Sequence, residues 1–288
     1  PNKTFRVDVT GVGEGLSHTH YTALQVKNAI IDFQRERWGL RSSIDLSNPD
    51  LCFHLHLANN QAVLSADGIN SSLHKRGYRP AVGMAPIKET LAAGLMRMTG
   101  WDGTINLVDP LCGSGTFLIE AVSNLLGIAS GIDRQFLFKD WPDFDKSIWD
   151  REFKMAKEVK PFKKKLPKII GCEYDEKIAK SASDNVRKAA LENYIKIINC
   201  PFQEFKLPSG LGLLVCNPPY GKRIGDENRL PMLYKKLGEY CKKNASGWDL
   251  WLLNGNPQLS KYIRMKANRR FQVNNGSIDC RWLNYKIK

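Results

Sequence analysis

The stretch that decides the fold is Leu213-Leu214-Val215-Cys216-Asn217-Pro218-Pro219-Tyr220-Gly221. Its first four residues are apolar, which predicts a short buried strand. The strand cannot continue into the next four residues, because each proline removes a backbone donor and restrains the residue before it. A rigid polar turn therefore follows the carboxyl end of a strand, which is where open α/β sheets bind their ligands.

A second strand, Thr104–Val108, ends in a glycine-rich turn that leads into a helical pattern over Phe117–Leu126. The turn is Asp109-Pro110-Leu111-Cys112-Gly113-Ser114-Gly115-Thr116. Its two glycines allow the backbone to approach a ligand, and the start of the helix offers free N–H groups. Asp109 could accept a hydrogen bond from a ligand ammonium group. We therefore predict a ligand-binding turn rather than a purely structural one.

A third strand, Lys168–Glu173, ends in a carboxylate. At this place in a nucleotide-binding sheet, an acid accepts hydrogen bonds from both ribose hydroxyls. The alternative is a charge that favours the start of the helix Ile178–Ala190.

The other elements complete an α/β pattern. The strands expected after Glu173 are Ile195–Ile198, the opening strand, Leu250–Leu253, Arg270–Val273 and Ile278–Tyr285. A helix over Leu230–Lys243 separates two of them, and Asn274-Asn275-Gly276 predicts a hairpin turn between the last two. An antiparallel finish after alternating strands and helices resembles the seven-stranded mixed sheet of class I methyltransferases.

The amino-terminal residues 1–66 form a separate pattern of a small α+β unit. The elements expected there are the strand Phe5–Val9, the helix Tyr21–Trp38 and the strands Leu51–Leu57 and Gln61–Leu64. Residues 131–167 interrupt the α/β order and are expected to be a partly helical insertion. The domain boundary is expected between Arg79 and Pro86.

Two weaker patterns in this unit are better explained without a ligand. Gly11–Gly15 lies between a strand and a helix, but it lacks the spacing of a dinucleotide-binding turn. His54 and His56 share one strand face without a third metal ligand at a suggestive spacing. No metal site is expected.

Composition favours a polyanionic partner. The 288 residues include 43 Lys and Arg against 29 Asp and Glu, a formal net charge of +14, which points to nucleic acid. The seven cysteines are odd in number and include no C-x-x-C, so neither disulfides nor a cysteine zinc site is indicated, and a cytoplasmic protein is expected. No apolar stretch is long enough to span a membrane, and no membrane partner is expected.

The segment Leu73–Pro80 is the predicted RNA contact, because it combines Lys75, Arg76 and Arg79 with the aromatic Tyr78. Cations can contact phosphates and the ring can stack on a base. A solvated linker would give the same composition.

Several motifs together resemble one family. Besides the two turns, they are Ser72-Leu-His-Lys-Arg-Gly-Tyr-Arg, Ala85-Pro-Ile-Lys-Glu-Thr-Leu-Ala-Ala, Glu120 and Asn275-Gly-x-Ile-Asp-Cys-Arg. The combination resembles the THUMP-domain guanine-N2 methyltransferases of large-subunit ribosomal RNA, over essentially the whole chain. It implies a partial THUMP domain with a linker over 1–79 and a class I methyltransferase domain over 80–288.

The resemblance implies S-adenosylmethionine as the cofactor. Asp109, Gly113 and Gly115 would hold its methionine end, with Thr116, Pro110 and Cys112 in the same turn. Glu173 would hold the ribose, and Tyr174 and Phe202 would lie at the adenine. Relatives often carry an acid for the adenine amine where this chain has Asn199-Cys200-Pro201-Phe202, so we expect backbone atoms to make that contact.

The Asn-Pro-Pro-Tyr turn would then carry catalysis. A guanine amine is a poor nucleophile, and the side-chain carbonyl of Asn217 with the backbone carbonyl of Pro218 could accept its two hydrogens and direct its lone pair at the methyl group. Pro219 would keep these acceptors rigid and Tyr220 would stack on a base brought out of its helix or loop. Arg223 could contact a phosphate or base, or form a salt bridge.

Other activities share these features. The expected substrate is 23S ribosomal RNA, but a tRNA guanine-N2 methyltransferase and a DNA adenine methyltransferase use the same turn. An inactive methyltransferase fold that binds RNA during ribosome assembly is the alternative from another functional class.

Overall fold

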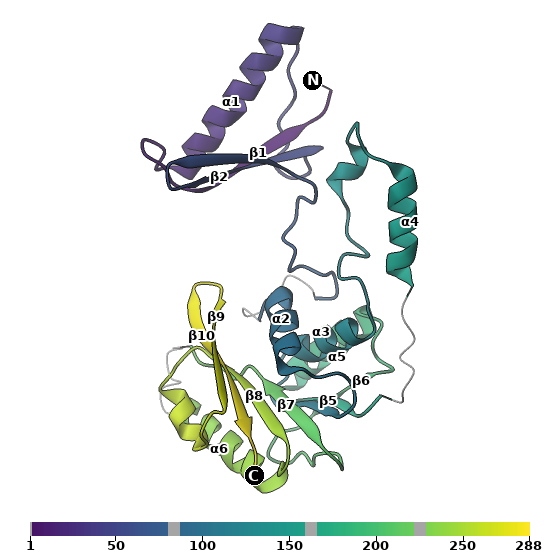
Figure 1. The fold of residues 1–288 in the computed structure, drawn as a ribbon, viewed down its shortest axis with the longest axis vertical. Helices are drawn as coiled ribbons and strands as arrows, with labels where there is room; N and C mark the ends of the chain where they lie inside the picture. The colour runs from purple at the N-terminus through teal and green to yellow at the C-terminus, as the bar shows by residue number, and fades with distance from the viewer. Residues whose placement is uncertain (1, 80–86, 159–165, 222–228) are drawn as a thin grey trace. The chain divides into compact units, whose positions relative to one another are not determined.

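A computed structural model describes residues 2–79, 87–158, 166–221 and 229–288, and it contains two compact units (Figure 1). The first unit comprises residues 1–72 with 133–154, and the second comprises residues 73–132 with 155–288. Residues 133–154 therefore group with the amino-terminal unit, although in the sequence they interrupt the methyltransferase-like part. The predicted boundary between Arg79 and Pro86 falls in a stretch whose residues 80–86 lie outside the described part of the chain.

The first unit is built on a three-stranded sheet in the order β1-β2-β3. Its elements are β1 (Phe5–Gly11), α1 (Thr19–Trp38), β2 (Leu51–Ala58) and β3 (Gln61–Asp67). β1 and β2 are parallel and are joined through α1, whereas β2 and β3 form an antiparallel hairpin. Its turn places Asn59 and Asn60 at φ of 51° and 55°, a backbone conformation that asparagine tolerates better than most residues.

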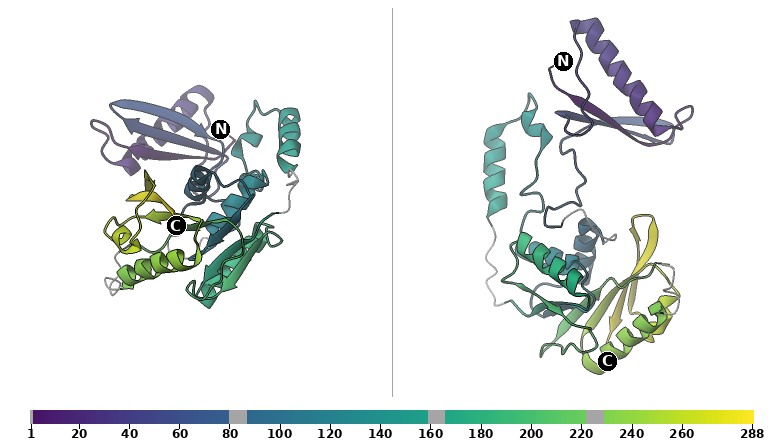
Figure 2. Two further views of the ribbon diagram at one scale, coloured as in Figure 1. Left: turned by 60° about the horizontal axis from the view of Figure 1, so that its bottom comes forward. Right: turned by 180° about the vertical axis from the view of Figure 1, so that it is seen from behind.

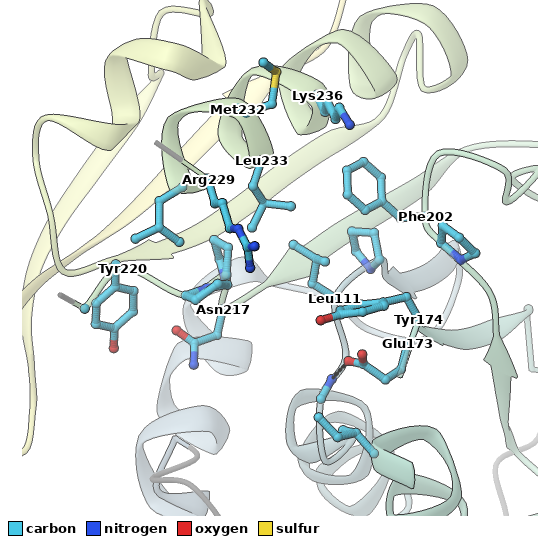
Figure 3. Close-up of a pocket in the computed structure, with 18 of the residues that line it drawn as sticks. Leu111, Glu173, Tyr174, Phe202, Asn217, Tyr220, Arg229, Met232, Leu233 and Lys236 are labelled. Carbon is cyan, nitrogen blue, oxygen red and sulfur yellow. Dashed lines mark hydrogen bonds between the residues drawn. The ribbon is translucent and has the colours of Figure 1, made fainter. Parts of the chain in front are cut away.

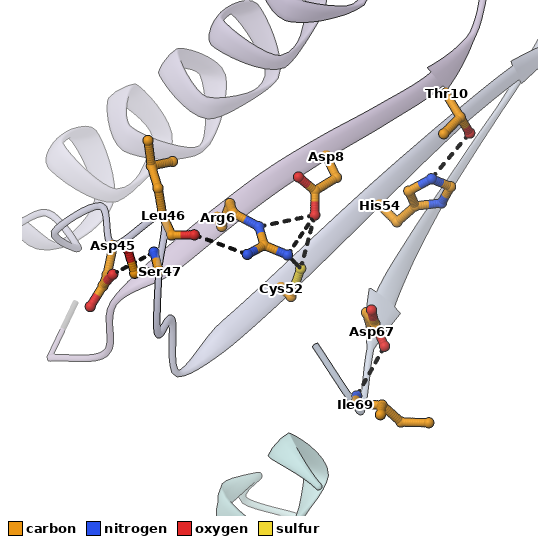
Figure 4. Close-up of polar contacts among 10 residues, drawn as sticks. All are labelled: Arg6, Asp8, Thr10, Asp45, Leu46, Ser47, Cys52, His54, Asp67 and Ile69. Atoms are coloured by element: carbon orange, nitrogen blue, oxygen red, sulfur yellow. Dashed lines mark hydrogen bonds and ion pairs between the residues drawn. The ribbon is translucent and has the colours of Figure 1, made fainter. Parts of the chain in front are cut away.

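The two faces of this sheet differ in character. Phe5, Leu55 and Leu57 are buried, while the alternate residues carry polar side chains (Figure 4). There Arg6 Nε donates to Asp8 Oδ2 at 3.0 Å. Thr10 Oγ1 lies within hydrogen-bond distance of His54 Nε2 (3.1 Å) and of His56 Nδ1 (2.9 Å), so the histidine pair has a structural partner.

The insertion contributes an aromatic cluster to the first unit. It contains the short 3-10 helix η1 (Leu137–Asp140) and most of α4 (Lys146–Lys157). The ring of Trp149 packs against Phe136, Phe138 and Phe144 at centroid distances of 5.2, 5.5 and 6.3 Å. The backbone N–H of Leu137 donates to the carbonyl of Gly68 at 2.7 Å, which ties the insertion to the chain that follows β3.

The second unit is a seven-stranded sheet in the order β6-β5-β4-β7-β8-β10-β9. Its strands are β4 (Asn106–Asp109), β5 (Ile169–Glu173), β6 (Ile195–Asn199), β7 (Gly212–Cys216), β8 (Asp249–Asn254), β9 (Arg269–Asn275) and β10 (Ile278–Lys286). The first five strands in the sheet are parallel, and β10 is antiparallel to both β8 and β9. The predicted mixed sheet with an antiparallel last strand is confirmed.

Helices cover both faces of this sheet (Figure 2). They are α2 (Glu89–Thr99), α3 (Thr116–Leu125), α5 (Glu176–Lys188), α6 (Arg229–Asn244) and the short 3-10 helix η2 (Leu259–Ile263). Along β7, Leu213 and Val215 pack in the core with α2, α3 and α5, whereas Leu214 and Cys216 pack in the core with α6. β7 is therefore continuously apolar, because both of its faces are buried.

The two turns predicted to bind a ligand meet at the point where the strand order reverses. The chain proceeds from β4 outward to β5 and β6, and then returns to place β7 on the other side of β4. The carboxyl ends of β4 and β7 thus lie side by side, at the switch point where ligands bind in such sheets.

Candidate cofactor and substrate pocket

A pocket of about 1220 Å³ opens at the carboxyl edge of the second unit's sheet (Figure 3). Nine of the residues predicted from the sequence line it: Pro110, Gly113, Glu173, Tyr174, Phe202, Asn217, Pro218, Pro219 and Tyr220. Asp109, Cys112, Gly115 and Thr116 are not among the lining residues. In Figure 3, Asn217 lies between Tyr220 on one side and Glu173 with Tyr174 on the other.

Glu173 is oriented by backbone groups. Its Oε2 accepts from Gly113 N at 3.2 Å and its Oε1 accepts from Asp175 N at 3.0 Å. Glu173 is 8% exposed as a residue and still lines the pocket. It can therefore accept further hydrogen bonds from a ligand while the glycine-rich turn holds it in place.

Asp109 lies beneath the turn at the end of β4 and is 2% exposed. Its Oδ1 accepts from Leu111 N at 3.1 Å, and within the described ranges it forms no ion pair. Burial raises the pKa of its carboxyl well above the usual range, and the nearby Glu173 raises it further, against the lowering effect of the Leu111 hydrogen bond. A buried acid without a counterion among the described residues therefore lies at the end of β4, next to the lining residues Pro110 and Leu111, and a cationic ligand would stabilise its charged form.

The glycine-rich turn is held by side chains of neighbouring elements. Gly115 caps the start of α3 at φ 77°, which side-chain-bearing residues rarely adopt. Asn185 Nδ2 donates to the carbonyl of Ser114 at 3.1 Å. Thr116 Oγ1 is 2.9 Å from Ser114 Oγ and 3.3 Å from Arg79 Nη1, so Thr116 is engaged in holding the turn.

An exposed ring and a buried ring line the pocket near Glu173. Tyr174 is 73% exposed, and Phe202 is 3% exposed. Asn199 Nδ2 donates to the carbonyls of Glu173 and Tyr174 at 2.9 and 3.0 Å. Asn199 thus orders the backbone that presents Tyr174.

Asn217 presents an unpartnered acceptor. Its Oδ1 is buried, and within the described chain it has no hydrogen-bond partner. A buried amide oxygen without a partner costs on the order of 1–3 kcal/mol. A ligand N–H would remove this cost.

Tyr220 is fixed at its hydroxyl. Asn275 Nδ2 donates to Tyr220 Oη at 2.8 Å. Burial raises the pKa of Tyr220 to about 12, with the Asn275 hydrogen bond acting in the opposite direction. The phenol is therefore neutral at physiological pH.

The predicted RNA-contact arginines face inward. Arg76 Nε lies 3.3 Å from the buried Glu120, and Arg79 Nη2 lies 3.1 Å from the buried Glu89. Their side chains are only 16% and 15% exposed, so both guanidinium groups serve as internal counterions. Lys75 is exposed, and Arg223 lies outside the described residues.

Sequence patterns missed several residues of the pocket. Lys88, Arg229 and Lys236 bring cations to it, and Asn275, Gly276 and Ile278 bring the tip of the β9–β10 hairpin. Two family-like motifs were available signals, the one beginning at Ala85 for Lys88 and the one around Asn275 and Ile278 for the hairpin tip, but neither carried a site prediction.

All seven cysteines are free thiols. No group of three or more potential metal ligands is found within the described ranges. None of the described helices is both long and apolar enough to cross a bilayer.

The sheet order, the antiparallel last strand and the pocket at the switch point define a class I methyltransferase fold. The family model described as the RMKL-like methyltransferase domain matches residues 76–284, and the THUMP domain model matches residues 1–67. The chain therefore belongs to the RMKL-like methyltransferase family and carries a THUMP domain. This confirms the family that the sequence motifs predicted.

Individual relatives agree with this assignment. Protein slr0064 of Synechocystis sp., named as a candidate RNA methyltransferase, is 42% identical over all of this chain and 75% of its own length. The ribosomal RNA large subunit methyltransferase K/L of Syntrophotalea carbinolica is 38% identical over 99% of this chain, which spans only 41% of that protein. The solved structure of SMU.472, a candidate methyltransferase complexed with SAH, has a TM-score of 0.86 and 28% identity, covering 99% of this chain and 75% of that one.

Proposed function

We propose that this chain transfers a methyl group from S-adenosylmethionine to the exocyclic N2 amine of a guanine in large-subunit (23S) ribosomal RNA. The observation that carries the proposal is the buried, unpartnered Oδ1 of Asn217 in the pocket beside Tyr220. An acceptor without a partner is what an amine substrate requires. Membership of the RMKL-like family and the THUMP domain support RNA as the substrate class.

The residues present fit S-adenosylmethionine. The cofactor carries an ammonium group and a sulfonium, and the buried acid Asp109 forms no ion pair within the described ranges. Glu173 would accept from the ribose hydroxyls, and the exposed ring of Tyr174 with Phe202 would flank the adenine. Gly113 and Gly115 would bring backbone groups close to the methionine end. When bound, the cofactor supplies an electrophilic methyl group.

Asn217 and Pro218 would orient and activate the substrate amine. Their two carbonyl oxygens would accept the hydrogens of the guanine amine and orient its lone pair. They would also stabilise the positive charge that develops on the nitrogen during transfer. No strong general base is needed, because the proton can leave after the methyl group has been transferred.

The test is radiolabel transfer from S-adenosylmethionine to three substrates: large-subunit ribosomal RNA, tRNA and duplex DNA. We expect label in the ribosomal RNA, and we expect nucleoside mass spectrometry to identify N2-methylguanosine. Label in tRNA alone or in DNA alone would contradict the proposed substrate. Calorimetry with S-adenosylmethionine is the companion measurement, because absence of binding would indicate an inactive methyltransferase fold.

A further inference from the structure

Tyr220 is held at two points by residues that lie outside the Asn-Pro-Pro-Tyr turn. Asn275, at the end of β9, donates through Nδ2 to the Tyr220 hydroxyl at 2.8 Å. Gly255, immediately after β8, lies against the edge of the Tyr220 ring. These contacts come from chain segments 35 and 55 residues beyond the tyrosine in the sequence.

The strand register explains how the hairpin reaches the pocket. β10 pairs with β8 antiparallel, and Arg281 lies opposite Asn254, the last residue of β8. Ile278 and its partner Asn275 in β9 therefore lie beyond the carboxyl end of β8. The hairpin tip thus extends over the edge where β7 releases the catalytic turn, and Asn275, Gly276 and Ile278 line the pocket.

Gly255 is required by the closeness of the ring. A Cβ built on Gly255 would lie 2.5 Å from both Cδ2 and Cε2 of Tyr220, and 3.1 Å from Cγ2 of Ile278. The first distance is well inside van der Waals contact, so any side chain at position 255 would displace the tyrosine ring. Glycine is required at position 255 because the Tyr220 ring approaches so closely. Its backbone conformation does not require glycine, since it lies outside the left-handed region.

We propose that Asn275 and Gly255 are positioning residues that together set the plane of the Tyr220 ring, and so fix where the target base stacks. This inference rests on the proposed function, in which Tyr220 stacks on the guanine. Gly255 determines how closely the ring can approach β8, and Asn275 fixes the hydroxyl end. A ring held at its hydroxyl and along one edge presents one stacking plane, which reduces the entropy lost when the base binds.

Kinetics of the full chain on large-subunit ribosomal RNA test the hydrogen bond. Asn275→Ala and Tyr220→Phe each remove the same contact, so we expect each to lower kcat by roughly 5- to 10-fold, and we expect the double variant to lose no more than the single variants. The KM for S-adenosylmethionine should stay within about 2-fold of the wild-type value, because the contact lies away from the cofactor residues. Independent, multiplicative losses in the double variant would overturn the proposal.

Asn274→Ala is the matched control. Asn274 is the neighbouring residue on the same hairpin, and its Nδ2 donates to Asp279 Oδ1 at 2.8 Å instead of to the tyrosine. If the Asn275 effect were a general weakening of the hairpin, Asn274→Ala would reproduce it. We expect its kcat to remain within about 2-fold of wild type.

A measurement that does not use the reaction separates this inference from the proposed function. In protein carrying ¹³C-labelled tyrosine, the resonance missing from Tyr220→Phe identifies Tyr220. We expect that resonance to shift in Asn275→Ala and in Gly255→Ala, and to stay in place in Asn274→Ala. An unchanged resonance in Asn275→Ala would refute the positioning role, whichever nucleic acid the protein methylates.

Discussion

At the scale of single residues, the ends of two neighbouring strands carry an unpartnered acceptor, which lines the pocket, and a buried acid without a counterion among the described residues. Asn217 Oδ1 is buried without a hydrogen-bond partner in the described chain, and Asp109 is buried without a counterion there. Both groups are unfavourable in the free protein and would be satisfied by a ligand that carries N–H groups and a positive charge. Their separate positions, at the ends of β7 and β4, predict separable effects on turnover and on cofactor binding.

Asn217→Ala removes the acceptor that we propose for the substrate amine. We expect kcat on ribosomal RNA to fall by about 10²-fold or more, since one preorganised acceptor is lost from the transition state. The dissociation constant for S-adenosylmethionine should change by less than about 3-fold. Single-turnover kinetics and calorimetry measure the two quantities. Asn217→Asp keeps an acceptor at this position and should retain more activity than the alanine variant, so equal loss in both would argue against the assigned role.

Asp109→Asn should have the opposite pattern. The amide still accepts from Leu111 N but no longer offers a negative charge to a ligand ammonium group. We expect cofactor affinity to fall by roughly 10- to 100-fold, the range for a lost hydrogen bond to a charged group. The melting temperature of the free protein should not fall, because burial already raises the pKa of this carboxyl. Unchanged affinity in calorimetry would show that Asp109 does not contact the cofactor.

At the scale of elements, the segment 76–79 links α2 and α3, because its side chains contact Glu89 on α2 and Glu120 on α3. Tyr78 Oη donates to Glu120 Oε1 at 2.9 Å, and Arg76 lies 3.3 Å from the same carboxylate. Arg79 also donates to the carbonyl of Ile87 at 3.1 Å. This network holds the beginning of α3, which carries the glycine-rich turn, and it predicts a pH effect.

Burial raises the pKa of Glu120 to about 7, in spite of the opposing attraction of Arg76 and the Tyr78 hydrogen bond. Between pH 4.5, the ordinary value, and pH 7, the folded state therefore binds a proton that the unfolded state has released. The contribution of this group to stability is fully present below pH 4.5 and is lost as the pH rises to 7, by about 3 kcal/mol at most.

Glu120→Gln should remove this dependence. Urea unfolding of the wild type and the variant at pH 5 and pH 7.5 measures it: the wild type should lose more free energy of unfolding over this interval than the variant does. Equal pH dependence in both proteins would show that Glu120 titrates near its ordinary value. The exposed Glu239→Gln is a suitable control, because its weak contact with Lys235, at 3.9 Å, is on the surface.

The elements also show what the sequence could predict. β7 with its turn and β4 with its glycine-rich turn were predictable, because each motif is contiguous and its prolines and glycines act locally. Arg76 and Arg79 show that composition alone does not predict what a charged side chain contacts. Their charge suggested RNA, but the buried partners Glu120 and Glu89 lie on helices whose packing the sequence pattern did not reveal.

The contribution of the β9–β10 hairpin to the pocket could not be predicted from the sequence for a different reason. Asn275 reaches Tyr220 because of the register between β10 and β8, and Gly255 matters because a ring happens to lie against it. Both are properties of packing between distant segments. Hydrophobic periodicity predicts that such strands exist, but it does not say which residues extend past the end of a neighbouring strand.

At the scale of the whole molecule, the charge of +14 predicts that RNA recognition depends strongly on salt. Each phosphate that the protein neutralises releases counterions, with a slope of about 0.7 to 0.9 in log affinity per log salt. If about four phosphates are neutralised, the dissociation constant for ribosomal RNA should rise by roughly 10²-fold between 50 and 200 mM salt. Cofactor affinity should change by less than about 3-fold over the same range, because the proposed charged contacts, Asp109 and Glu173, are buried and buried charges are screened less by salt. Filter binding with ribosomal RNA and calorimetry with S-adenosylmethionine give the two slopes, and a flat RNA slope would mean that the positive charge serves another partner.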